Sequence, residues 1–353
     1  MVSQPGVRRH LTTVLLGVTV VTMSLGACAG STTSSATAAK TSGGSSAIRK
    51  GLKIAFLPKQ LNNRYFVAAD SGGKQATVAM GGVFREVGPA TATEGQASYV
   101  DPLTEEGDNA IVASAQDPTS MCDALKRAMA VKIAVVTFDA DTSPECRNIF
   151  VSQASAETIG RTQVQLLGRQ LNFSGEIAIL SASPSANNQN AWIGFMRDEL
   201  NKPEYAKMKL VTVVYGDDDD AKSTAQTMAL LSGNPNLKGI ISPTTIGIKA
   251  AAQVLRGSAY QGKVQLVGLG TPNDMRQFVK DGTVQAFELW DPGKLGQLAA
   301  YAAMSLASGI ITGAKGDKFT AGDLGRYTVA DSGEVVLGDP VVFNIQNVDK
   351  FDF

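Results

Sequence analysis

Histidine is nearly absent from this sequence of 353 residues, in which His10 is the only one. It lies in an N-terminal segment that we expect to be removed, so the mature chain would contain none. A Ser-His-Asp triad, a Cys-His pair and a histidine-containing zinc site all need an imidazole. These types of nucleophilic catalysis and of metal site are therefore excluded.

An excess of charge of either sign is absent as well. The chain has 32 basic and 32 acidic residues and no long basic stripe. Proteins that bind nucleic acid or anionic membranes gather lysine and arginine on one face. We therefore expect no nucleic-acid partner, and the balance favours neutral ligands.

Cysteine is scarce, and the first of the three cysteines follows an export signal. Arg8 and Arg9 precede a short apolar run, residues 14–25, which leads into Leu-Gly-Ala-Cys28. The run is too short to span a membrane and is typical of a signal peptide. The last four residues resemble the lipobox of bacterial lipoproteins, which implies a signal peptide at residues 1–27, a lipid on the Cys28 thiol and anchoring to the outer face of the cytoplasmic membrane. An ordinary secretory peptide is the alternative.

Cys122 and Cys146 are then left as an even pair in an oxidising compartment. Such a pair favours a disulfide over a metal site or a reactive thiol. Two separate buried thiols are the alternative. We expect the disulfide, and no metal.

A low-complexity segment separates the lipidated cysteine from the folded body. Residues 30–44 are almost all Ser, Thr, Ala and Gly, which cannot bury enough apolar surface to fold. We expect residues 28–50 to form a flexible linker. About 300 residues follow, enough for two domains of ordinary size.

The body alternates short β-branched runs with amphipathic stretches. The runs occupy residues 53–59, 109–115, 132–140, 176–182, 210–216, 239–244 and 264–270. Nearly continuous apolar runs separated by helices indicate parallel strands that are buried on both faces. We therefore expect an α/β fold with two doubly wound parallel sheets, divided near residues 150–155.

In such sheets ligands bind at the carboxyl ends of the strands. This rule selects Pro58-Lys59, Asp139 to Asp141, residues 181–189, Pro243 to Thr245 and Gly268 to Gly270.

Four carboxamides stand together in residues 187–190, inside the stretch SANNQNAWIGF. Carboxamides both donate and accept hydrogen bonds without net charge, so the cluster suits a neutral polyhydroxylated ligand. Capping of the helix that begins there is the alternative.

Three other patterns have simpler explanations. Residues 257–263 have phosphate-loop spacing but precede a strand and lack the Ser or Thr that holds magnesium. The acids of residues 217–220 suit the N-terminus of a helix. Asp139 and Asp141 could be a glycosidase pair, but alternation along an extended segment would point both the same way, where they could accept hydrogen bonds from sugar hydroxyls.

The chain from Lys53 to about Ile311 resembles the periplasmic sugar-binding proteins of ABC transporters, in the branch that includes rhamnose-binding and autoinducer-2-binding proteins. The motifs that carry the resemblance lie at residues 55–66, 136–141, 151–161, 179–193, 213–220, 241–248, 268–276, 280–287 and 289–293.

The resemblance implies two lobes with crossovers near residues 153, 290 and 320, and no enzymatic activity or cofactor. The first lobe would contain residues 51–153 and 291–320. The second lobe would contain residues 154–290 and 321–353.

The resemblance also implies a ligand held between the lobes. Lys59 would donate to the ligand, Asp139 or Asp141 would accept from its hydroxyls, and Asn188 and Gln189 would contact it from the second lobe. Other expected contacts are Asn63, Tyr65, Phe66, Pro243, Thr244, Thr245 and, at the end of a predicted strand, Gly270. Trp192 and Trp290 are expected either to cover the C–H faces of the ligand or to pack in the core.

The expected ligand is a small neutral sugar or polyol, such as a rhamnose-like deoxyhexose or a pentose. Autoinducer-2 binders carry Asp-Gln where this chain has Asn188-Gln189, and Ala where it has Thr245, so both positions favour the rhamnose pattern. The expected partner is an ABC permease with a separate ATPase, and the binding protein itself is expected to be a monomer. Autoinducer-2 binding, a receptor that feeds a sensor protein and a lipid-anchored glycosidase remain alternatives.

Overall fold

The computed structural model describes residues 47–91 and 94–353. His10, the predicted signal peptide, Cys28 and most of the predicted linker lie outside the described residues. None of the helices within the described residues is long and apolar enough to cross a membrane.

The first lobe is built on a six-stranded parallel sheet in the order β13-β5-β4-β3-β1-β2. Its strands are β1 (Lys53–Leu57), β2 (Val83–Glu86), β3 (Ala110–Ala113), β4 (Ala134–Phe138), β5 (Ile149–Ser152) and β13 (Glu334–Val336). The helices that cover it are α1 (Arg64–Ala79), α2 (Val100–Glu105), α3 (Cys122–Ala130) and α9 (Pro292–Ala307).

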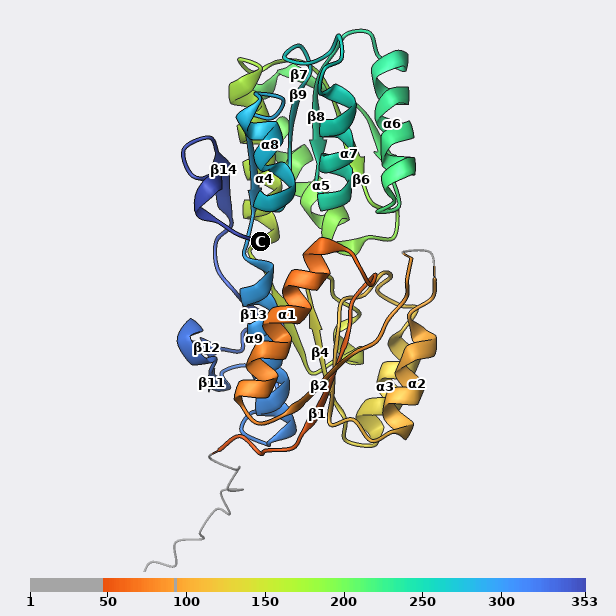
Figure 1. The fold of residues 1–353 in the computed structure, drawn as a ribbon, viewed down its shortest axis with the longest axis vertical. Coiled ribbons are helices and arrows are strands. Elements are labelled where there is room, and N and C mark those ends of the chain that lie inside the picture. Colours follow the sequence, from red (N-terminus) through yellow and green to blue (C-terminus); the bar gives the residue numbers. More distant parts are fainter. Residues whose placement is uncertain (1–46, 92–93) are drawn as a thin grey trace, which may run out of the picture. The chain divides into compact units, whose positions relative to one another are not determined.

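Successive side chains of these strands enter two different cores, as expected for a sheet buried on both faces. Ile54 and Phe56 pack with residues of α1 and α9, whereas Ala55 and Leu57 pack with residues of α2 and α3. Figure 1 shows α1 and α9 side by side on one face and α2 and α3 on the other. A Cβ at Gly296 would lie 1.8 Å from the Ala69 carbonyl oxygen, so glycine is what lets α9 lie so close to α1.

The second lobe is built on a four-stranded parallel sheet in the order β7-β6-β8-β9. Its strands are β6 (Ser174–Ser181), β7 (Lys207–Tyr215), β8 (Leu237–Ser242) and β9 (Gln265–Gly268). Its helices are α4 (Ala156–Gln170), α5 (Asn187–Leu200), α6 (Asp220–Gly233), α7 (Thr245–Leu255) and α8 (Pro272–Lys280). The antiparallel pair β10 (Ala286–Leu289) and β14 (Val341–Asn344) adjoins β9, and β11 (Lys318–Thr320) pairs with β12 (Arg326–Thr328). The predicted α/β class with parallel sheets is confirmed.

One predicted boundary between the lobes is wrong. Residues 321–336 were expected in the second lobe, but β13 pairs in parallel with β5 and completes the first sheet. Val335 is buried at that edge. The chain therefore leaves the first lobe after Val336, where it leads to β14, and not near residue 320.

Two helices that begin at the boundary between the lobes, α1 and α9, have side-chain caps at their N-termini. Asn63 accepts from the backbone N–H of Tyr65 at 3.0 Å at the start of α1. Asp291 accepts from the N–H of Lys294 at 3.1 Å at the start of α9, where Pro292 has the φ that a first helical residue needs. These caps fix where each helix begins, next to the carboxyl end of the strand before it.

Candidate functional site

A cavity of about 390 Å³, counting space open to solvent, lies at the carboxyl ends of both sheets. Side chains of both lobes line it: Lys59, Asn63, Tyr65, Phe66, Asp139, Asn188, Gln189, Trp192, Asp218, Pro243, Thr244, Thr245, Leu269, Leu289 and Trp290. The structure thus brings together twelve of the fourteen residues that the sequence predicts for the ligand site.

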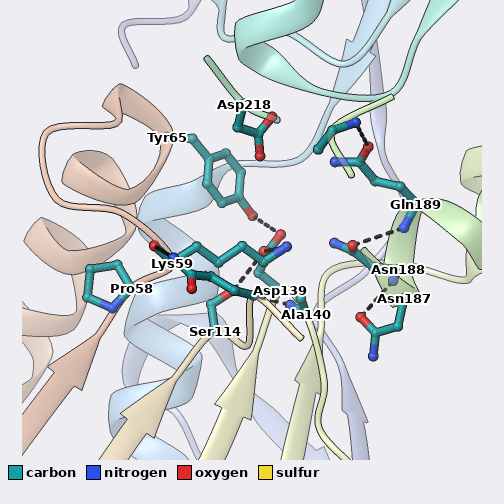
Figure 2. Close-up of polar contacts among 12 residues, drawn as sticks. Pro58, Lys59, Tyr65, Ser114, Asp139, Ala140, Asn187, Asn188, Gln189 and Asp218 are labelled. Atoms are coloured by element: carbon teal, nitrogen blue, oxygen red, sulfur yellow. Dashed lines mark hydrogen bonds and ion pairs between the residues drawn. The ribbon is translucent and has the colours of Figure 1, made fainter. Parts of the chain in front are cut away.

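Asp139 is the centre of the first lobe's contribution. It follows β4 with φ of 62°, a left-handed conformation that Asp tolerates better than most residues. Its Oδ2 accepts from Ser114 Oγ at 2.8 Å, and its Oδ1 accepts from the Tyr65 hydroxyl at 3.1 Å. The ammonium of Lys59 is 3.7 Å from Oδ2, and Figure 2 shows these groups gathered around the carboxylate. Asp139 is therefore held in one orientation next to a cation.

Tyr65 is held in place by Trp290. The indole Nε1 donates to the Tyr65 hydroxyl at 2.8 Å, so the hydroxyl proton is directed to Asp139. Burial, and next the nearby charge of Asp139, raise the pKa of Tyr65 well above its usual value. The phenol therefore stays a neutral donor.

Aromatic rings form the apolar part of the cavity. Trp192 and Trp290 have ring centroids 6.0 Å apart, and Tyr65 meets both Phe66 and Trp290 edge to face. Both indoles are buried in the core and also line the cavity, so packing and ligand contact are compatible roles. Such rings can cover the C–H face of a sugar.

The second lobe contributes amide donors. Gln189 Oε1 accepts from Ser181 Oγ at 2.7 Å and from the N–H of Ala182 at 2.8 Å, which leaves the Nε2 group as the part that can serve a ligand. Asn188 Oδ1 accepts from the N–H of Gln189 at 2.9 Å, so its Nδ2 is likewise the free end. Ala186, not an asparagine, occupies the N-cap position of α5.

Asn187 connects the two lobes directly. Its Nδ2 donates at 2.6 Å to the carbonyl oxygen of Asp141 in the first lobe. A second contact joins the Arg64 guanidinium of α1 to Asp274 of α8 at 3.3 Å. The lobes are therefore in direct contact at two places.

Two predicted contacts lie outside this cavity. Asp141 forms a two-fold ion pair with Arg147, with Nε 2.8 Å from Oδ1 and Nη2 2.6 Å from Oδ2. Asp139 and Asp141 line a neighbouring cavity together, but only Asp139 lines this one. The segment is not extended at Asp139, whose φ is 62°. Gly270 packs beneath the Met275 side chain, where a Cβ would lie 2.5 Å from Met275 Cγ. Neither residue is thus available to a ligand in the cavity.

Asp218, Leu269 and Leu289 also line the cavity but were not among the predicted contacts. Leu269 lies within the Gly268 to Gly270 stretch that the strand-end rule selected, and Leu289 is the last residue of β10, so the same rule could have found it. Asp218 stands in the acidic run that was assigned to a helix cap, and Asp219 does accept from the N–H of Lys222 at 2.7 Å. The Asp218 carboxylate instead accepts from the Thr244 hydroxyl. Burial raises its pKa, while Lys59 acts in the opposite direction.

Cys122 and Cys146 are joined by a disulfide across the start of α3, with their Cα atoms 5.1 Å apart. Glu145 lies beside them, and the three side chains have the proximity of metal ligands. Sulfurs bonded to each other are not thiolates, however, so this cluster is no metal site while the bond is intact.

Solved structures with the same fold bind sugars and related molecules. A sugar ABC transporter protein from Actinomyces odontolyticus is 46% identical, over 86% of this chain and 98% of its own, with a TM-score of 0.70. A solute-binding protein from Clostridium phytofermentas with bound L-rhamnose is 36% identical, over 85% and 98%, with a TM-score of 0.82. LsrB from Clostridium saccharobutylicum in complex with AI-2 is 25% identical, over 86% and 100%, with a TM-score of 0.81.

The family model for the periplasmic binding protein domain matches residues 54–310, which span both lobes and all the residues that line the cavity. The predicted resemblance is confirmed, as is the absence of enzymatic activity, since these are non-enzymatic transport proteins. The chain belongs to the periplasmic binding protein family, among the sugar-binding solute-binding proteins of ABC transporters.

Proposed function

We propose that this chain is a lipid-anchored, monomeric binding protein that captures a small neutral sugar or polyol, L-rhamnose or a similar deoxyhexose first among them, and delivers it to an ABC permease with a separate ATPase. The observation that carries the proposal is the cavity itself. Lys59 and Asp139 of one lobe line it together with Gln189 and Asn188 of the other and with two indole rings. Hydrogen-bond donors and acceptors from both lobes, together with aromatic rings, match the O–H and C–H groups of a sugar.

The preference for L-rhamnose over autoinducer-2 has two supports. Asn188 and Thr245 agree with the rhamnose-binding pattern and depart from that of autoinducer-2 binders. The relative solved with L-rhamnose is 36% identical to this chain, compared with 25% for the one solved with AI-2.

Binding would act by a population shift between open and closed arrangements of the lobes. A ligand that bonds to Asp139 and Gln189 at once bonds to both lobes, and only the closed form offers both. Each such hydrogen bond contributes a net ~0.5–1.5 kcal/mol. Several of them together outweigh the free-energy difference of a few kcal/mol that favours an open form.

A thermal-shift panel tests the proposal. The purified protein is heated with L-rhamnose, D-ribose, D-arabinose, short polyols or autoinducer-2. A ligand present at about 100 times its Kd stabilises the native state by about 2.7 kcal/mol, which raises the melting temperature measurably. We expect the largest shift with L-rhamnose or another neutral deoxyhexose. A shift with autoinducer-2 alone contradicts the assigned ligand, and no shift with any sugar contradicts the function.

The anchor is tested separately by growth with labelled palmitate. We expect label in the wild-type protein and none in a Cys28→Ser variant. An unlabelled wild-type protein would mean an ordinary secretory peptide.

A further inference from the structure

The four consecutive acids after β7 do not share one role. Asp219 caps α6, Asp217 pairs with Lys222, and Asp220 is exposed in the first turn, where it suits the positive end of the helix dipole. Asp218 does none of these. Its side chain lines the cavity, across from Lys59 and Asp139 (Figure 2).

The backbone of this loop is held in a rare conformation that places Asp218. Asp217 and Asp218 have φ of 53° and 48°, and two successive left-handed residues other than glycine are unfavourable. Hydrogen bonds from the N–H groups of Gly216 and Asp217 to the carbonyls of Ser181 and Ala182, at 2.9 and 2.7 Å, hold the loop. Surroundings that retain such strain are typical of functional sites.

Ser181 and Ala182, which hold this loop, also position Gln189. Ser181 Oγ and the Ala182 N–H donate to the Gln189 amide oxygen. The Thr244 hydroxyl, itself at the cavity, donates to the Asp218 carboxylate and orients it. Asp218 is therefore fixed in the same framework as a residue that faces the ligand.

Asp218 leaves the cavity with more negative than positive charge. Lys59 is the only basic residue among those that line the cavity, and its ammonium is already 3.7 Å from Asp139. Burial raises the pKa of Asp218, and the facing carboxylates Asp139 and Asp217 act in the same direction, whereas the Thr244 hydroxyl and Lys59 lower it. Two carboxylates thus share one ammonium.

We infer that Asp218 is a specificity-determining residue of the sugar site: its carboxylate accepts hydrogen bonds from hydroxyls of a neutral ligand and, because Lys59 is shared with Asp139, repels acidic sugars. This inference rests on the proposed function and deepens it. It restricts the ligands to neutral sugars and polyols and excludes sugar acids and sugar phosphates. An anion in the cavity would meet a carboxylate from each lobe and only one cation.

Isothermal titration of wild-type protein, Asp218→Asn and Asp220→Asn tests the inference. Three probes are used: L-rhamnose, L-rhamnitol, and L-rhamnonate, which has a carboxylate where L-rhamnitol has a CH₂OH group. We expect Asp218→Asn to bind L-rhamnose about ten-fold or more weakly, because hydrogen bonds to charged groups are the stronger ones. We also expect the preference for L-rhamnitol over L-rhamnonate to fall by about ten-fold. Asp220→Asn, whose side chain is exposed on α6, should behave as the wild type in both respects.

Asp218→Glu keeps the charge and serves as a second variant. It should keep the preference for L-rhamnitol over L-rhamnonate even where the longer side chain weakens L-rhamnose binding. If Asp218→Asn loses L-rhamnose but rejects L-rhamnonate as strongly as before, Asp218 only supports the loop and the inference is overturned. Wild-type affinity in Asp218→Asn also overturns it and leaves the proposed function intact. A wild-type protein that binds no sugar or polyol overturns the proposed function itself.

Discussion

The indole nitrogen of Trp290 donates to the hydroxyl of Tyr65 at 2.8 Å, and Tyr65 donates in turn to Asp139 at 3.1 Å. The three residues come from the ends of three separate elements, β10, the first turn of α1 and β4. Because the hydroxyl oxygen accepts a hydrogen bond from the indole N–H, its own O–H is directed to the carboxylate. A residue at a crossover between the lobes thereby fixes the main acceptor in the sugar cavity.

Removing the Tyr65 hydroxyl, the middle group of these linked hydrogen bonds, should lower both the free energy of unfolding and the affinity for sugar. Tyr65→Phe leaves the buried indole N–H without an acceptor, which costs about 1–3 kcal/mol of unfolding free energy. Asp139 loses one of its donors, and we expect the affinity for L-rhamnose to fall about ten-fold. Urea unfolding and isothermal titration measure the two effects. Tyr327→Phe is the control, since that hydroxyl makes only a long bond of 3.4 Å to Leu337 outside the cavity. Unchanged affinity in Tyr65→Phe would show that the hydrogen bond from the phenol to Asp139 does not contribute to sugar binding.

The amide of Asn188 should matter as a donor. Its oxygen is already bonded to the N–H of Gln189, so Asn188→Asp keeps that bond and loses only the Nδ2 donor. The new carboxylate also adds negative charge beside Asp139 and Asp218. We expect L-rhamnose affinity to fall at least ten-fold, about 1.4 kcal/mol, by isothermal titration.

Asn190→Asp is the matched control for that substitution. Asn190 is exposed, and its Nδ2 donates to the carbonyl of Pro184, away from the cavity. It should leave sugar affinity unchanged. Equal affinity in both variants would remove Asn188 from the ligand site.

The fold could be predicted because its strands are nearly continuous apolar runs. Residues 53–59 and 132–140 indicate strands buried on both faces, and the structure places β1 and β4 there. β13 could not be found this way: it has three residues, and it joins the edge of a sheet whose other strands all lie between Lys53 and Ser152. Its place depends on pairing with β5, which no local pattern records.

Much of the candidate site follows from the strand-end rule, which selects Lys59, Asp139 and Pro243 without any motif. The rule does not give the direction of a side chain. Arg147 engages the Asp141 carboxylate, so only Asp139 of this pair lines the cavity. Asp218 was missed since an acidic run before a helix satisfies the capping rule with Asp219 alone. The backbone conformation of two or three loop residues thus determines which side chains line the cavity, and the periodicity of the sequence does not reveal that conformation.

The disulfide should stabilise the first lobe without affecting sugar affinity. Closing the loop between Cys122 and Cys146 removes entropy from the unfolded chain, worth about 3 kcal/mol in the chain-entropy model. We expect no free thiol from these two residues in the denatured, unreduced protein when Ellman's reagent is used. The double variant Cys122→Ser, Cys146→Ser should melt at a lower temperature, with wild-type affinity, because neither residue lines the cavity. Two reactive thiols in the oxidised protein contradict the bond.

The last prediction concerns Glu288 on β10, two residues before Trp290. The side chain is fully buried and its carboxyl oxygens have no hydrogen-bond partner within the described residues. Burial raises the pKa of Glu288 well above its usual value, and the nearby Gln163 amide, which donates to the Ile159 carbonyl, only partly opposes this.

Because its pKa is raised in the folded state, Glu288 lowers the free energy of unfolding by an amount that depends on pH. Below about pH 4 the carboxyl is protonated in both the folded and the unfolded chain, and nothing is lost. As the pH rises through the folded-state pKa, the unfolded chain releases the proton freely while the folded chain must keep it or bury a charge, so the free energy of unfolding falls. Glu288→Gln removes this cost. The variant should be more stable than the wild type at pH 7.5, and the difference should shrink toward pH 4.5 in urea unfolding.

Glu105→Gln, at an exposed position on α2, is the control for that substitution and should show no such pH-dependent difference. A stability difference between Glu288→Gln and the wild type that is constant with pH would mean that Glu288 is not titrating, and that shape or packing explains the effect. A wild type that is the more stable at pH 7.5 would mean that the buried carboxylate has a partner that compensates its charge. Because β10 leads directly to Trp290, the affinity of Glu288→Gln for L-rhamnose should also be measured by isothermal titration. A wild-type affinity would separate the effect on stability from any effect on the sugar site.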